Sequence, residues 1–128
     1  MEYLIGVALA VAAGMVGWLA GLDRDRAFYP IVLIVIASYY DLFAVIGGGE
    51  ALAAELVASL IFGALAIVAF RYSLWIAVAA LMGHGIFDFV HPHLIENPGV
   101  PTWWPMFCAA YDVTAGAFLA LQLRRRAT

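Results

Sequence analysis

The sequence predicts an all-α integral membrane protein, a bundle of five transmembrane helices with the N-terminus outside and the C-terminus inside. Three observations predict this class: the composition, the length of the apolar stretches and the positions of the arginines. Of the 128 residues, 66% are hydrophobic and 12% are charged, against roughly 45–50% and about 25% in soluble domains. The net charge of -3 argues against nucleic acid as a partner. The expected location is the inner (cytoplasmic) membrane of a bacterium, as a multi-pass protein.

Five stretches reach the length that a membrane span requires, about 20 mostly apolar residues. They cover residues 3–22, 28–46, 50–70, 73–91 and 104–123. Because the remaining segments are short, no soluble domain is expected. Residues 1–128 are predicted to form one transmembrane domain.

The boundaries of the first three spans follow from charged, proline and glycine residues. Residues 23–26 (Asp-Arg-Asp-Arg) end the first span, and Glu2 replaces the basic start of a signal peptide, so this helix is expected to be retained. Pro30 suits the first turn of the second span, and residues 47–49 (Gly-Gly-Gly) separate the second span from the third. Small residues at helical spacing also predict that the first span packs closely on another helix: Gly6, Ala10 and Gly14.

The fourth and fifth spans enclose the one substantial loop. Pro92 is expected to end the fourth span, and residues 93–103 contain Asn97-Pro98-Gly99, a sequence typical of a turn. Pro105 fits the first turn of the last helix.

The arginines predict the orientation, because cytoplasmic loops of membrane proteins are enriched in basic residues. The chain has six arginines and no lysine. Arg24 and Arg26 follow the first span, Arg71 follows the third, and residues 124–126 follow the fifth. The two alternate loops carry no arginine, so the N-terminus is predicted to lie outside.

Polar residues inside the spans are the main functional signal. A charged residue at the bilayer centre costs at least about 2.5–3.5 kcal/mol, and no arginine or lysine accompanies these acids. They must therefore be protonated, metal-bound or hydrated. At about 1.5 Å of rise per residue, all of these groups fall between roughly 2 and 9 Å on the outer side of the midplane. The set comprises Asp41, Glu55, His84, Asp88, Cys108 and Asp112.

The spacing of these residues favours a divalent metal site. His84, Asp88 and His91 are spaced i, i+4 and i+7, which places them on one helix face. Together with Asp112 and Cys108 they are predicted to bind zinc, iron or manganese. Asp41 and Glu55 are the candidate catalytic residues, because a carboxylate beside metal-bound water acts as a general base. Such a site suits a hydrolase or isomerase that acts from the non-cytoplasmic side on a lipophilic small molecule among the membrane lipids.

Other interpretations of the same residues remain open. The acids could be neutral and hydrogen-bonded between helices, Cys108 could be a packing residue, and residues 91–93 could be a solvated helix end. Intramembrane acids and histidines also mark ion pathways, so a metal-ion or proton transporter is a second hypothesis. The inner halves of the spans carry almost nothing polar, which argues against a continuous pathway. A structural subunit of a larger complex and a homo-oligomer are further alternatives.

Residues 71–112 resemble a family of small bacterial multi-span membrane proteins of uncharacterised function. The resemblance rests on H-x3-D-x2-H from His84 to His91, on Asn97-Pro98, and on C-x3-D from Cys108 to Asp112, in about a third of the chain. It implies that His84, Asp88, His91, Cys108 and Asp112 form a shared polar core, and it implies no reaction. The sequence His91-Pro92-His93 departs from the adjacent histidines of that pattern, which leaves the role of His93 open.

Overall fold

The computed structural model describes residues 1–127 and is built entirely from helices and their connections. Each of the five α-helices is long and apolar enough to cross a membrane, which confirms the all-α prediction with five helices. The elements are α1 (Glu2–Ala20), the short 3₁₀ helix η1 (Leu22–Arg24), α2 (Phe28–Ile46), α3 (Leu52–Arg71), α4 (Leu74–Leu94) and α5 (Trp104–Ala127).

The helix ends differ from the predicted spans by up to four residues. α1 ends at Ala20 instead of residue 22, α3 covers Leu52–Arg71 instead of 50–70, and α4 and α5 extend furthest beyond their predicted ends. α4 continues through Pro92 to Leu94, because a proline in the last turn removes only one hydrogen bond and its fixed φ is compatible with a helix. The prediction that the fourth span ends at Pro92 is therefore wrong by one short turn. α5 continues through residues 124–126, where three arginines interact favourably with the negative end of the helix dipole.

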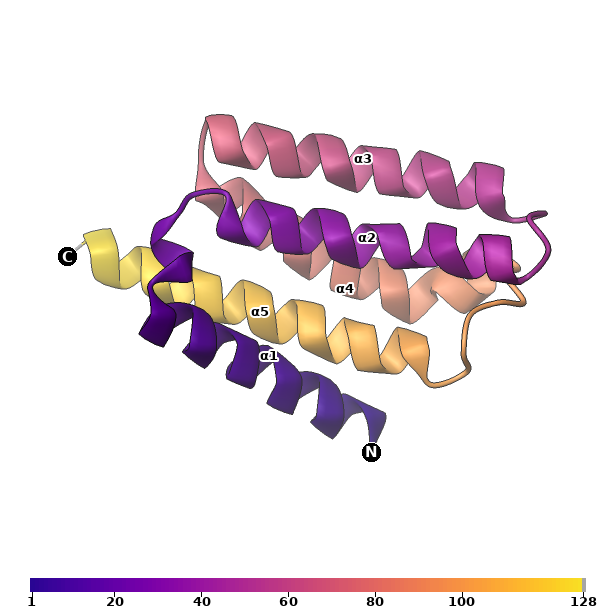
Figure 1. Ribbon diagram of the computed structural model, residues 1–128, viewed down its shortest axis with the longest axis horizontal. Helices are drawn as coiled ribbons and strands as arrows, with labels where there is room; N and C mark the ends of the chain where they lie inside the picture. The colour runs from indigo at the N-terminus through magenta and orange to yellow at the C-terminus, as the bar shows by residue number, and fades with distance from the viewer. Residues whose placement is uncertain (128) are drawn as a thin grey trace.

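The five helices lie side by side with their axes roughly aligned (Figure 1). α5 packs between α1 and α4, while α3 contacts both α2 and α4. Their shared core contains Leu33, Ala66, Leu81 and Leu119. The outer surface is also apolar, with Leu60 of α3 70% exposed, as expected of helices that face lipid.

The small-residue face of α1 packs within the bundle. A Cβ added at Gly6 would collide with the carbonyl oxygen of Phe107, and one added at Gly14 would lie 3.0 Å from the ring of Phe118. Both neighbours belong to α5. The close approach predicted for this helix is therefore made with α5 of the same chain.

All arginine-bearing segments meet at one end of the bundle, here called the arginine end. The guanidinium of Arg26 donates to the carbonyl oxygen of Phe70 through Nε and Nη2, at 3.2 and 2.9 Å. Arg126 Nη2 donates to the carbonyl oxygen of Asp23 at 3.0 Å. The opposite end, here called the loop end, carries the N-terminus and the α2–α3 and α4–α5 connections (Figure 1).

The α4–α5 connection is held against the loop end of α2. A Cβ at Gly99 would collide with the carbonyl oxygen of Phe43 and lie 2.8 Å from the backbone nitrogen of Gly47. Only a glycine allows the two backbones to come this close. This contact fixes the position of Asn97, whose side chain reaches into the bundle.

Candidate metal centre

A histidine and two aspartates meet in the interior of the bundle. His84 and Asp88 come from α4 and Asp112 from α5, and all three side chains are essentially inaccessible to solvent. His84 Nδ1 lies 2.6 Å from Asp112 Oδ2 and 3.4 Å from Asp88 Oδ2. One potential ligand atom from each residue lies within 4.8 Å of the others. These three residues, here called the triad, are close enough together for one cation to contact all of them.

Small residues at the α4–α5 interface create this proximity. A Cβ at Gly85 would lie 2.8 Å from Val113 Cγ2 and 3.2 Å from the carbonyl oxygen of Ala109. On α5, Gly116 is packed against the side chain of Met82 in the same way. Because neither glycine has a side chain, the two helices approach closely and Asp112 reaches His84.

Tyr40 of α2 connects the triad to a second group of polar residues. Its hydroxyl donates to Asp88 Oδ1 at 2.8 Å, and its ring stacks on His91, with ring centroids 3.9 Å apart and an interplanar angle of 13°. Tyr40 was not among the predicted site residues, although a tyrosine at this depth needs a partner for its hydroxyl. That requirement was the signal that could have identified it.

The second group lies closer to the loop end and contains Glu55, His91 and Asn97. His91 Nε2 is 2.5 Å from Glu55 Oε1, so the structure brings His91 together with Glu55 of α3. Asn97 Nδ2 donates to the carbonyl oxygen of Tyr40 at 3.2 Å and to Glu55 Oε1 at 3.4 Å. Asn97 was predicted only as part of a turn, and its polar contacts depend on the docking of the loop.

The remaining candidate residues lie around these two groups. Cys108 is buried on α5, one turn from Asp112, and outside the three-residue triad. Asp41 is partly buried on α2, near Ser59 and Glu55, so it belongs to the surroundings of Glu55. His93 is exposed at the end of α4.

Several buried carboxylate oxygens have no hydrogen-bond partner within residues 1–127. They are Asp41 Oδ1, Glu55 Oε2, Asp88 Oδ2 and Asp112 Oδ1. Buried polar atoms are normally paired, because leaving one unpaired costs about 1–3 kcal/mol. Two of the four belong to the triad, so the triad has free ligand capacity.

The surroundings of the triad differ between its two sides. Towards the arginine end, the buried side chains of α4 and α5 that follow the triad are apolar, among them Ala77, Leu81, Ala115 and Leu119. Towards the loop end, a pocket of about 300 Å³ is lined by His91, Asn97 and residues of the α4–α5 loop. The polar interior therefore opens towards the loop end.

The donor set defines the chemistry available. One imidazole and two carboxylates match zinc, iron or manganese, which accept mixed nitrogen and oxygen ligands.

No family model, curated protein or solved structure matches this chain. The resemblance described above remains a prediction.

Proposed function

We propose that this chain is an integral membrane enzyme that binds one divalent metal ion through His84, Asp88 and Asp112. The observation that carries the proposal is the triad itself, buried in the bundle with two carboxylate oxygens unpaired. The proposed substrate is a lipophilic molecule that enters from the non-cytoplasmic side. The proposed reaction is a hydrolysis or an isomerisation.

Charge balance supports a bound cation. Glu55 has His91 as a partner at 2.5 Å, whereas Asp88 and Asp112 share a single imidazole. All arginine-bearing segments lie at the far end of the bundle. A divalent cation bound to neutral His84 would balance the charges of both carboxylates and fill the ligand capacity of the unpaired oxygens.

The arrangement favours a catalytic metal over a structural one. Three protein ligands leave a coordination position free, which is typical of catalytic zinc sites. A metal ion in such a site acidifies a bound water molecule. The Glu55–His91 pair lies outside the triad, with the ring of Tyr40 stacked on His91 and the Tyr40 hydroxyl donating to Asp88.

A groove on the bundle surface supports a lipophilic substrate. A groove of about 400 Å³ between α1, α4 and α5 is lined mainly by apolar residues, including Val7, Ile86 and Phe89. Gly85, which follows the ligand His84, also lines it. An acyl or isoprenoid chain in the bilayer could occupy such a groove.

The same structure argues against a transport pathway. A continuous pathway needs polar groups on both sides of the site, but buried apolar residues separate the triad from the arginine end. The triad itself is buried, and the pocket nearest to it in the polar interior is the loop-end pocket lined by His91 and Asn97.

The metal content of the purified protein tests the proposal. Protein prepared without chelators should contain close to one equivalent of zinc, iron or manganese by elemental analysis. Asp88→Asn and Asp112→Asn preserve side-chain shape and should reduce that content to background. His93→Ala changes an exposed histidine outside the triad and should leave the content unchanged. A metal-free wild-type protein would refute the proposal, and metal-dependent conversion of a lipid extract tests the enzymatic part separately.

A further inference from the structure

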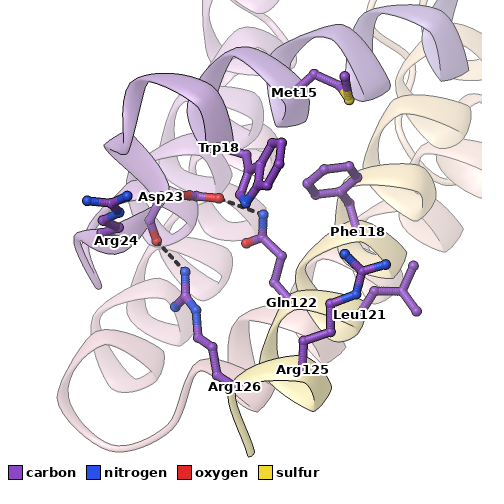
Figure 2. A pocket seen from close by; sticks show the side chains of 9 residues that line it. All are labelled: Met15, Trp18, Asp23, Arg24, Phe118, Leu121, Gln122, Arg125 and Arg126. Atoms are coloured by element: carbon purple, nitrogen blue, oxygen red, sulfur yellow. Dashed lines mark hydrogen bonds between the residues drawn. The ribbon is translucent and has the colours of Figure 1, made fainter. Parts of the chain in front are cut away.

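A second pocket lies at the arginine end, far from the triad and unrelated to it. It has a volume of about 400 Å³ and is formed by the end of α1, by η1 and by the last turns of α5. Figure 2 shows arginine side chains around it and aromatic side chains pointing into it. The pocket thus combines a basic part with an apolar part.

Helical spacing places the pocket residues of α5 on one face, with the apolar ones opposite α1. Phe118, Leu121, Gln122 and Arg125 of α5 are spaced i, i+3, i+4 and i+7, so they share one face. From α1, Met15 and Trp18 line the same pocket. Phe118 is held by α1, because its ring fills the space beside Gly14. Trp18 is 57% exposed, a position typical of tryptophan at a membrane–water interface.

The basic part carries a net positive charge. Three arginines, Arg24, Arg125 and Arg126, line the pocket with a single acid, Asp23, and three positive charges against one negative leave an excess of two. Asp23 is buried, and its Oδ2 accepts a hydrogen bond from Gln122 Nε2 at 2.5 Å. The carboxylate is therefore already engaged by a neighbour.

Gln122 provides a further polar atom. While Nε2 donates to Asp23, Gln122 Oε1 is buried and has no hydrogen-bond partner in the described part of the chain. Such an acceptor can be satisfied by a hydroxyl group. Because this oxygen has almost no accessible surface, a ligand hydroxyl reaches it only if the Gln122 amide turns towards the pocket.

We propose that this pocket binds the headgroup of an anionic phospholipid of the cytoplasmic leaflet. Arginine matches phosphate oxygens in charge and geometry, and basic pockets between transmembrane helices are known to bind anionic headgroups. The phosphate contacts the arginines, and the acyl chains lie along Met15, Trp18, Phe118 and Leu121. A zwitterionic lipid has no net negative charge to balance the two excess positive charges of the pocket.

Lipid binding to the full-length protein in detergent tests the proposal. Phosphatidylglycerol, phosphatidylcholine and inorganic phosphate are titrated separately, and the thermal unfolding midpoint and native mass spectra are recorded. We expect phosphatidylglycerol to bind and to raise the midpoint, with little effect of the other two. Arg24→Gln combined with Arg125→Gln should weaken this binding about 30-fold, which corresponds to about 1 kcal/mol per arginine.

A charge-matched control separates a pocket from a general surface effect. Arg71→Gln combined with Arg124→Gln also removes two arginines from the arginine end, and neither residue lines the pocket. This variant should bind phosphatidylglycerol like the wild type. Equal weakening in both double variants would overturn the proposal, as would equal binding of phosphatidylcholine or an equal effect of inorganic phosphate alone.

Discussion

Tyr40 is the residue on which both polar groups depend. Its hydroxyl holds Asp88, its ring lies on His91, and its carbonyl oxygen accepts from Asn97. Groups that hydrogen-bond to metal ligands orient those ligands, and their loss typically lowers metal affinity by about 10–100-fold. Tyr40 is therefore expected to position Asp88 and not to bind the metal itself.

Tyr40→Phe removes the donor to Asp88 and keeps the ring. We expect metal affinity to fall by about 10–100-fold, measured by competition with a chromogenic chelator, while the helical content stays unchanged. Tyr29→Phe is the matched control, because the hydroxyl of Tyr29 is buried without a partner among the described residues. Its loss should be neutral or slightly stabilising. Unchanged affinity in Tyr40→Phe would contradict the assigned role.

The site could be predicted from the sequence only in part. The common depth of His84, Asp88 and Asp112 follows from span boundaries and helical rise, and these three residues do meet. His91 shares their helix face, but seven residues correspond to roughly 10 Å along the axis. In the structure His91 Nε2 lies beside Glu55 Oε1, and His91 is outside the triad. The partner of His91, Glu55, could not be foreseen because it depends on how α3 is rotated against α4.

At the level of elements, the contact between α4 and α5 determines the triad. Gly85 is a position of close approach and is next to His84 in sequence. A Cβ added at Gly85 would lie 3.5 Å from the Cβ of Asp112. A side chain at this position must displace the side chain of Val113 or push α5 outward, since the carbonyl oxygen of Ala109 also lies 3.2 Å away. The separation between Asp112 and His84 would then increase.

Gly85→Ala should therefore weaken both the bundle and the metal site. Overpacking of this kind costs about 1–3 kcal/mol, which unfolding in sodium dodecyl sulfate can measure, and metal content should fall with it. Gly83→Ala on the same helix is the control, because an added Cβ there has no atom within 4 Å among the described residues. Gly83→Ala should keep its metal and gain up to about 1 kcal/mol from helix propensity. If the two variants behave alike, packing at Gly85 does not control the site.

Helix boundaries were predictable because proline, glycine and charged residues mark most of them. The second span, 28–46, agrees with α2 (Phe28–Ile46). The largest differences are at the ends of α4, which includes Pro92, and of α5, which includes residues 124–126. Local signals give the ends of elements, whereas docking of the α4–α5 loop through Gly99 and Gly47 depends on contacts between distant segments.

For the whole molecule, the two ends of the bundle have opposite character. The arginine end holds every arginine-bearing segment and the proposed lipid pocket. The loop end holds the pocket that reaches His91 and Asn97. If basic segments stay in the cytoplasm, the polar interior opens on the non-cytoplasmic side, and the proposed substrate must enter from there.

Cysteine labelling in intact cells can test this orientation. In a Cys108→Ala background, Glu50→Cys and Glu96→Cys introduce thiols at exposed positions of the loop end, and Tyr72→Cys introduces one near the arginine end, where Tyr72 is 75% exposed. We expect a membrane-impermeant maleimide to label the first two in intact cells and the third only after permeabilisation. The wild-type protein should remain unlabelled, because Cys108 is buried. Labelling of Tyr72→Cys alone in intact cells would show the opposite orientation, with the loop end in the cytoplasm.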